Sequence, residues 1–165
     1  MNSDLLSRAL ALIENVTPLK TDCGALCGAA CCRDDNDAGG GVWLLPGEDA
    51  GSMTWGHCNA GIMPVTKEKC VTLFCDKPCE RGLRPFMCRI FPLSPYFSKK
   101  REEWDVRIDR RSAMLCPLFA YGTKGLNPEF VANCRAAVRL LAEDDEYLEL
   151  LEKLQAEEAA YRIEL

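Results

Sequence analysis

The sequence is poor in histidine and has no long apolar run. Its 165 residues include a single histidine, and the formal net charge is −5 at pH 7. No apolar stretch approaches the roughly 18 residues that a membrane-spanning helix needs. Residues 1–8 lack the basic start and continuous apolar segment of a secretory signal peptide. These absences favour a cytoplasmic protein that does not contact a membrane.

Signatures of common enzymes are missing as well. The chain contains no hydrolase nucleophile elbow, no phosphate-binding glycine loop and no paired catalytic carboxylates. Residues 46–49, Pro-Gly-Glu-Asp, predict a turn that carries acids. Any cysteine with a lowered pKa could act as a nucleophile or redox thiol, but the sequence singles none out. Whether the protein is an enzyme stays open, and catalytic residues are unknown.

Charge is distributed unevenly along the chain. Residues 143–165 hold nine acidic side chains, whereas residues 77–111 hold ten basic ones. The acidic segment is typical of the solvated face of a helix. The basic segment lacks regularly interleaved aromatic residues, and the whole chain is acidic, so nucleic-acid binding is disfavoured. We interpret these basic residues as compensation for nearby thiolates.

Cysteine, in contrast, is abundant, with 11 residues. A chain of this length can bury a hydrophobic core without covalent staples. The odd count and the adjacent pair Cys31-Cys32 also disfavour a disulfide framework of the kind found in secreted proteins. Buried, inert thiols would account for two or three of the cysteines. The spacing of the others favours metal ligation.

The candidate ligands fall into an early group and a set of later residues. Four cysteines lie within residues 23–32, where short spacings let one loop present several thiolates to one centre. Four more follow downstream, which is enough for two four-thiolate sites or one larger cluster. The eight candidate metal ligands are Cys23, Cys27, Cys31, Cys32, Cys75, Cys79, Cys88 and Cys116.

The remaining cysteines and the histidine have simpler interpretations. Cys134 falls on the apolar face of a predicted helix, so we expect it to be buried and not a ligand. Cys70 is equally compatible with a core position and with ligation. Cys58 and His57 are neighbours, and a lone histidine is more often structural than a ligand. The three tryptophans, Trp43, Trp55 and Trp104, are expected in the core.

Several cysteine-containing segments together match a known pattern. They are Lys-Thr-Asp-Cys at 20–23, the pair Cys31-Cys32, Cys-Asp-Lys-Pro-Cys at 75–79, Arg-Pro-Phe-Met-Cys-Arg-Ile-Phe-Pro at 84–92, and Cys116-Pro117. In this order, over residues 18–120, they resemble the bacterial and archaeal CxxCxxCC-type cysteine-cluster family, described as zinc- or iron-chelating domain proteins. The resemblance implies metal binding but no particular activity, since most members have no known function.

Two details qualify this resemblance. The chain has three residues instead of two between Cys27 and Cys31, and it carries extra cysteines at 58, 70 and 134. A related cysteine motif occurs in flagellin lysine-N-methylases, which are much longer and are thought to carry an iron–sulfur cluster. The exact membership of the ligand set therefore stays open.

Thiolates suit both an iron–sulfur cluster and zinc. We prefer iron–sulfur, because four thiols within ten residues, two of them adjacent, suit a polynuclear centre. Arg84 and Arg89, together with Arg81, are expected to offset the negative charge of the loaded site. The leading hypothesis is a redox protein or a component of a modification pathway. The alternatives are a zinc-stabilised protein-interaction module without catalysis and a metal storage or delivery protein; a protein partner is unidentified.

The expected fold is a single α+β domain over residues 1–165. Leu5, Ala9, Leu12, Ile13 and Val16 recur at helical spacing, which predicts an N-terminal helix ended by Pro18. Short antiparallel strands are predicted at 42–45, 53–56, 70–74 and 104–109, with a turn at 34–41 and a short helix within 84–92. Residues 18–120, which include these strands and the short helix, are expected to form a core organised by the bound metal.

A helical hairpin is predicted over residues 127–160. Asn127 and Pro128 are a helix cap and a first-turn proline. The residues expected on the inner face of the first helix are Phe130, Val131, Cys134, Val138 and Leu141. Asp144 or Asp145 is expected to cap the second helix, with Leu148, Leu151 and Leu154 turned inward.

Overall fold

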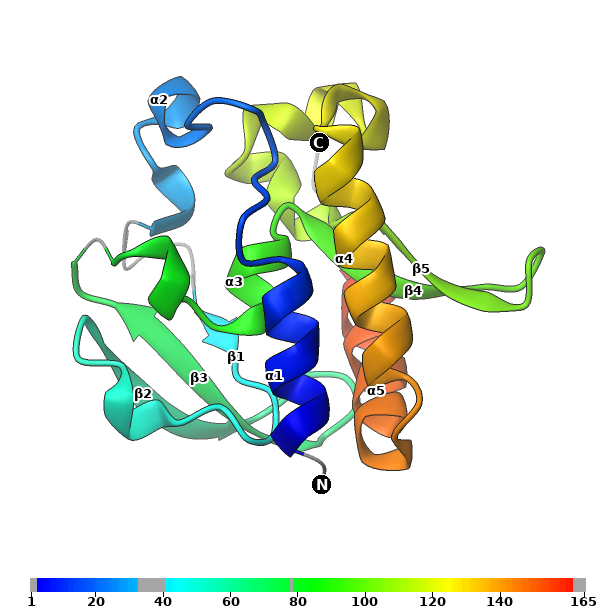
Figure 1. Cartoon of the computed structure of the whole chain (residues 1–165). Helices are drawn as coiled ribbons and strands as arrows, with labels where there is room; N and C mark the ends of the chain where they lie inside the picture. Colours follow the sequence, from blue (N-terminus) through cyan, green and yellow to red (C-terminus); the bar gives the residue numbers. More distant parts are fainter. Residues whose placement is uncertain (1–2, 33–40, 78, 162–165) are drawn as a thin grey trace.

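The computed structural model describes residues 3–32, 41–77 and 79–161 and confirms the α+β fold (Figure 1). The α-helices are α1 (Ser3–Leu12), α2 (Gly24–Cys27), α3 (Phe86–Ile90), α4 (Pro128–Leu141) and α5 (Asp145–Ala160). The strands are β1 (Val42–Trp43), β2 (Gly56–Ile62), β3 (Lys69–Cys75), β4 (Leu93–Ser98) and β5 (Glu103–Ile108). The 3₁₀ turns are η1 (Ala30–Cys32), η2 (Ala50–Ser52), η3 (Arg81–Leu83), η4 (Arg110–Met114), η5 (Pro117–Tyr121) and η6 (Thr123–Gly125). The predicted turn at 34–41 lies, apart from its last residue, outside the described residues.

The N-terminal helix is confirmed, but it ends at Leu12 and not at Pro18, and its buried face needs one correction. Residues at helical spacing turn inward, among them Ala9 and Ile13, which are fully buried. Leu12 was expected with them but is 38% exposed. The helix ends at Leu12, and the turn that follows brings Ile13 inward instead. Leu6, which the pattern did not include, is also buried.

The first sheet is antiparallel, with strand order β1-β3-β2. The predicted strand at 70–74 is confirmed as β3, and the one at 42–45 is the two-residue β1. The strand predicted at 53–56 is wrong: Met53 closes the turn η2, and the strand begins only at Gly56. A Cβ on Gly56 would lie 2.1 Å from the carbonyl oxygen of Phe74, so only glycine fits there. Because β2 contains glycine, asparagine and alanine, its β propensity is weak.

The second sheet is the antiparallel ribbon β4–β5. The strand predicted at 104–109 is confirmed as β5. Its apolar and charged residues alternate along the sequence, but its charged residues do not all face solvent as they would on a half-buried strand. Asp105 is only 2% exposed and forms ion pairs with Arg101 and Arg135. A buried carboxylate needs such partners. No pattern in the sequence predicted β4, because Pro95 interrupts its apolar run.

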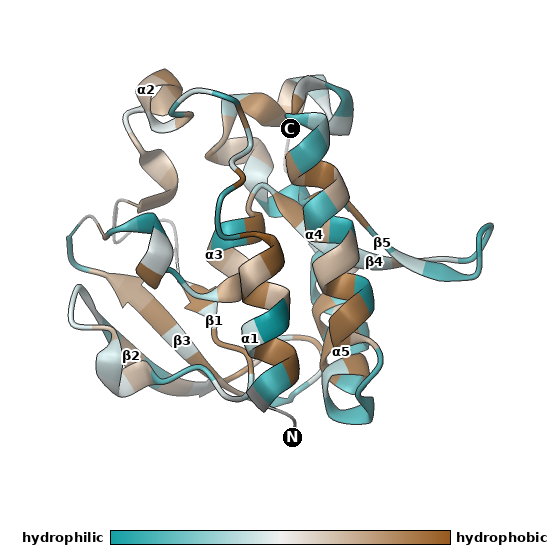
Figure 2. Ribbon diagram, viewed as in Figure 1, coloured by the Kyte–Doolittle hydropathy of each residue, from teal (hydrophilic) through white to brown (hydrophobic). Residues whose placement is uncertain are grey.

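The two C-terminal helices are confirmed, including their caps. The side chain of Asn127 accepts a hydrogen bond from the amide of Glu129, and Asp144 caps α5 in the same way. The five residues predicted on the inner face of α4 are all buried. In α5, Leu148 is only partly buried and Tyr147 takes the interior position instead. Figure 2 shows apolar and polar residues alternating along α1, α4 and α5, as expected of amphipathic helices.

The helices cover the β4–β5 ribbon and join it to the rest of the core. Helix α4 packs against α1 and β5, whereas α5 packs against β4 (Figure 1). One large apolar cluster extends from α1 through α3 to α5. A second, smaller cluster of Met53, Trp55 and Leu73 lies on the first sheet. Within the described ranges, no helix is both long enough and apolar enough to cross a membrane.

The carboxylate of Glu157, on α5, fastens the turn between β2 and β3. It accepts hydrogen bonds from the amides of Val65 (3.0 Å) and Thr66 (2.7 Å) and from the Thr66 hydroxyl (2.9 Å). We expect Glu157→Ala to lower the free energy of unfolding by about 2–3 kcal/mol, because it leaves several donors unpaired. Denaturant unfolding would measure this loss. Glu152→Ala, at an exposed position of the same helix, is the control with a change below about 0.5 kcal/mol; an equal cost for both variants would contradict the assignment.

Candidate metal centre

The early cysteines lie on two very short helical elements. Cys23 precedes α2, Cys27 ends it, and the pair Cys31-Cys32 belongs to η1. Gly28 has a φ of 61°, the left-handed conformation that ends a helix and favours glycine. Neither α2 nor η1 contains a buried residue. Apolar packing therefore contributes little to holding Cys27, Cys31 and Cys32 in place, whereas Cys23 packs against the main apolar cluster.

The later cysteines lie on better-packed elements. Cys75 is the last residue of β3, and Cys79 follows it after a short connection. Cys88 lies in α3, where Phe86, Met87, Arg89 and Ile90 are all buried. Cys116 lies between η4 and η5. The short helix predicted within 84–92 is thereby confirmed as α3, with Pro85 one residue before its start.

Four thiols form a first neighbourhood, the outer group: Cys23, Cys27, Cys31 and Cys116. Burial raises the pKa of Cys23, and the charges of Cys116, Asp22 and Cys27 raise it further. Burial also raises the pKa of Cys116, with Cys27 again contributing. The charges of Cys27 and Cys23 likewise act on the raised pKa of Cys31, after larger effects of Cys32 and burial. The fold thus brings Cys116 to the loop of residues 23–31.

The other four thiols form a second neighbourhood, the inner group: Cys32, Cys75, Cys79 and Cys88. Burial, followed by the charges of Cys79 and Cys32, raises the pKa of Cys75 to about 11. Burial also raises the pKa of Cys88, and the charges of Cys75, Cys32 and Cys79 add to the effect. Ionising these thiols together is unfavourable unless positive charge compensates.

The adjacent pair Cys31-Cys32 joins the two groups. Their sulfur atoms lie 3.9 Å apart, within hydrogen-bond distance, and either thiol can be the donor. This hydrogen bond lowers the pKa of Cys32 to about 6 and raises that of Cys31. All eight predicted ligands therefore lie in two adjoining neighbourhoods. As the side chains stand in residues 3–32, 41–77 and 79–161, no group of three or more cysteine, histidine or acidic residues is arranged to hold a metal ion.

Of the two arginines expected to offset the charge of the site, Arg84 lies among the cysteines. Burial lowers its pKa, but the charges of Cys32, Cys79 and Cys31 raise it above the ordinary value. Its Nη2 donates to the carbonyl oxygen of Cys79 at 3.4 Å. Arg84 thus supplies positive charge beside the inner group and beside the pair that joins the groups.

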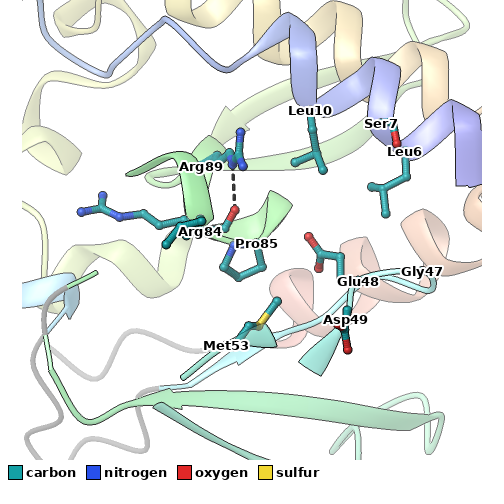
Figure 3. A pocket seen from close by; sticks show the side chains of 11 residues that line it. Leu6, Ser7, Leu10, Gly47, Glu48, Asp49, Met53, Arg84, Pro85 and Arg89 are labelled. Carbon is teal, nitrogen blue, oxygen red and sulfur yellow. Dashed lines mark hydrogen bonds between the residues drawn. The ribbon is translucent and has the colours of Figure 1, made fainter. Parts of the chain in front are cut away.

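Arg89 has a different environment. Its Nε donates to the carbonyl oxygen of Arg84 at 2.7 Å, the dashed line in Figure 3, and its Nη2 donates to that of Gly82 at 2.5 Å. Burial lowers its pKa, and the acidic groups that act against this are Glu14 and Glu48. In Figure 3 the two arginine side chains point in different directions from Pro85. Arg89 therefore fixes the backbone of the Arg-Pro turn, a role that its closeness to Cys88 in the sequence did not suggest.

Unpaired donors provide a test of whether these residues fit an anionic metal centre. Among the described residues, five buried polar side-chain atoms have no hydrogen-bond partner: Nε1 of Trp55, Nε of Arg81, Nε of Arg84, Oγ of Ser94 and Nε of Arg107. The first three belong to side chains beside the cysteines, since Cys23 acts on the pKa of Arg81 and Cys75 and Cys79 pack against the cluster that contains Trp55. Buried N–H groups seldom lack an acceptor, and thiolate sulfur accepts such bonds. The residues present fit a thiolate-ligated metal centre.

The cysteines outside the two groups have other surroundings. Cys134 is 0% exposed, as predicted, and burial raises its pKa to about 12. Cys58 and Cys70 are partly buried on β2 and β3. His57 stacks on Phe74, and its Nδ1 lies 2.9 Å from a carboxylate oxygen of Asp76. Whether Cys58, Cys70 or His57 binds metal is still a prediction.

The expectation for the tryptophans is confirmed for two of them. Trp55 and Trp104 are buried, whereas Trp43 is partly buried beneath the guanidinium of Arg111, 5.4 Å from its ring centroid. The sequence assigned Trp55 to the core only. Its indole N–H is buried and unpaired, and Cys75 and Cys79 pack against the cluster that contains it. The sequence carried no signal for this position, because residues 55 and 75 are brought together by the pairing of β2 with β3.

A cavity of about 240 Å³ lies between α1 and the Arg-Pro turn (Figure 3). Leu6 and Leu10 face it from α1, and Glu48 and Arg89 face it from the other side. The carboxylate of Glu48 accepts hydrogen bonds from the amides of Phe86 (2.6 Å) and Leu45 (2.8 Å). Burial raises its pKa. Glu48 therefore anchors the start of α3, the helix that carries Cys88. From the sequence, residues 46–49 were predicted only as a turn that carries acids, and this anchoring role was not predicted.

No family model, curated protein or solved structure matches this chain. The fold and site define an α+β protein in which eight cysteines from four separate stretches of the chain act on one another's pKa values in two adjoining groups. The resemblance to the CxxCxxCC-type family is still a prediction from the sequence motifs.

Proposed function

We propose that this protein is a cysteine-cluster metal-binding protein of the CxxCxxCC type that holds its metal through the outer and inner groups. The observation that carries the proposal is the meeting of four cysteines from residues 23–32 with four from distant parts of the chain. A hydrophobic core does not require such a gathering. Thiolates, soft ligands that bind iron–sulfur clusters and zinc, account for it.

The electrostatics of the site support the same proposal. Mutual repulsion adds to burial in raising the pKa values of Cys23, Cys75 and Cys88. The two nearby arginines, Arg81 and Arg84, cannot neutralise eight thiolates. Cations bound by the sulfur atoms would supply the remaining charge, and metal binding would then release the thiol protons. Without bound cations the thiols would stay protonated, and the stabilisation from metal–thiolate bonds would be absent.

We prefer an iron–sulfur cluster as the bound group, with a redox role or a role in a modification pathway. The preference rests on the density of thiols in residues 23–32 and on Arg84, whose positive charge and N–H groups suit the sulfur atoms of a cluster. Such a cluster would supply one-electron chemistry when bound. The adjacent residues Cys31 and Cys32 connect the outer group with the inner group. Reduced thiols also favour the cytoplasm as the place where the protein works.

Zinc is the second candidate, and the number of thiols in each group favours it. A structural zinc site is tetrahedral and has four ligands. The outer group and the inner group contain four cysteines each. In this form the protein would be a zinc-stabilised interaction module, or a storage or delivery protein, without redox chemistry.

Anaerobic purification with elemental analysis and a visible absorption spectrum tests the proposal. An iron–sulfur protein is expected to contain iron and acid-labile sulfide and to have broad visible absorption that dithionite bleaches. A zinc protein is expected to be colourless, with zinc in stoichiometric amount. Protein that is folded and reduced but contains neither metal, and takes up neither on reconstitution, would refute the proposal.

A further inference from the structure

The two cysteine groups differ in how firmly the fold supports them. In the outer group, Cys27 and Cys31 lie on α2 and η1, which bury no residue, and Cys31 is exposed, whereas Cys23 and Cys116 pack against the main apolar cluster. In the inner group only Cys32 lies on η1; Cys75 and Cys88 lie on β3 and α3, whose side chains Leu73, Phe86 and Ile90 are almost completely buried. A ligand on a packed element keeps its position when a metal–sulfur bond opens, and the bond re-forms readily. A ligand on a weakly packed loop moves away more easily.

The groups differ also in the donors available to their sulfur atoms. Arg84, whose Nε is buried and unpaired, is close to two inner cysteines, Cys32 and Cys79. Trp55 is 6% exposed, and its Nε1 is likewise unpaired. Its carbonyl oxygen accepts hydrogen bonds from the amides of Asp76 (3.0 Å) and Lys77 (3.2 Å), so it lies directly beside the segment that carries Cys75 and Cys79.

The outer group has fewer unpaired donors. Arg81 lies near Cys23; its Nη2 donates to the carbonyl oxygens of Val16 (2.6 Å) and Arg89 (3.1 Å), and its Nε is buried and unpaired. An acid acts on each group, Asp22 on Cys23 and Asp76 on Cys75. The difference is therefore one side chain with an unpaired donor beside the outer group and two, Trp55 and Arg84, beside the inner group.

We infer that the two groups hold metal unequally: the inner group is a retained centre whose sulfur atoms accept hydrogen bonds from Trp55 and Arg84, and the outer group is an exchangeable centre. This inference rests on the proposed function. The outer group is the site at which a soft metal ion enters, leaves or passes to a partner. The inner group keeps β3 and α3 joined throughout.

Zinc serves as the probe, because thiolates bind it whichever metal the protein carries in the cell. The full-length protein is loaded with zinc and mixed with an excess of a chelator, and metal release is followed with a chromogenic dye. Two phases of similar amplitude are expected. Cys116→Ser should remove the fast phase, and Cys88→Ser should remove the slow one.

Two conservative variants test the proposed donors independently. Trp55→Phe removes the indole N–H but keeps a ring, and Arg84→Lys keeps the charge but removes Nε. Each should speed the slow phase about tenfold, as expected for the loss of a hydrogen bond to a metal ligand, and leave the fast phase unchanged. Trp43→Phe, at a tryptophan that lies against Arg111, is the control and should change neither phase.

The possible outcomes separate this inference from the proposed function. Release in a single phase, a slow phase that disappears in Cys116→Ser, or a slow phase unaffected by both Trp55→Phe and Arg84→Lys would overturn the inference. Each of these results still requires bound metal, so the proposed function would stand. Wild-type protein that binds less than one equivalent of zinc would refute the proposed function itself.

Discussion

Removal of the metal is expected to abolish hydrogen-exchange protection in residues 23–32 while α4 and α5 keep theirs. Neither α2 nor η1 buries a residue, so little apolar burial offsets the entropy of ordering this loop. That entropy costs about 1–2 kcal/mol for each residue fixed. Metal–thiolate bonds compensate, since metal-binding free energy becomes folding free energy when the empty site is disordered.

The C-terminal helices do not depend on the metal in this way. Both have side-chain caps, and α4 buries Phe130, Val138 and Leu141 in the main apolar cluster. Residues 128–158 should therefore remain helical in the metal-free protein. The same argument applies to β3 and α3, where Leu73, Phe86 and Ile90 are buried. The packing therefore limits the expected loss around the later cysteines to the connection between β3 and α3.

Hydrogen exchange with mass spectrometry on metal-loaded and metal-stripped protein measures this difference. Peptides covering residues 23–32 should lose their protection completely, and peptides from α4 should change by less than about twofold. Elemental analysis of the stripped sample is the control for metal removal. Equal protection of residues 23–32 in both samples would mean that another interaction orders the loop.

Replacement of Cys88 is expected to remove one of the two metal centres, whereas replacement of Cys134 should leave both intact. The two cysteines make a matched pair, because each lies on a helix and burial raises the pKa of both. They differ in their neighbours: the charges of Cys75, Cys32 and Cys79 act on Cys88, whereas Arg81 acts on Cys134. Only Cys88 therefore belongs to a group of thiols.

The measured quantities are the bound metal per chain and the free energy of unfolding. Cys88→Ser should bind about half as much metal as the wild type. Cys134→Ala should bind the full amount but lose about 1–2 kcal/mol of stability, because it leaves a small cavity in the core. The assignment would be wrong if Cys134→Ala lost metal or if Cys88→Ser kept all of it.

Local patterns in the sequence predicted the features that depend on near neighbours. Asn127-Pro128 and Asp144 mark the starts of α4 and α5, because capping involves residues only two or three positions away. Helical spacing placed Ala9 and Ile13 in the core. The short spacing within residues 23–32 selected cysteines that the structure also brings together.

Features that depend on long-range packing could not be predicted in this way. The division of Cys31 and Cys32 between two groups depends on where β3, α3 and η5 place the later cysteines. Glu48 anchors α3 from 38 residues away in the chain. Asp105 is buried because α4 presents Arg135 to it, and no alternation of residues along β5 indicates this.

Residue-resolved alkylation tests the central claim, that the outer and inner groups bind metal, most directly. The protein is treated anaerobically with iodoacetamide before and after metal removal, and each cysteine is quantified by mass spectrometry. The eight cysteines of the two groups should be protected when loaded and labelled when stripped. Cys31 should change most, because its side chain is exposed and only metal ligation would protect it. Labelling of Cys31 at the same rate in both samples, with the other seven also unchanged, would contradict the claim.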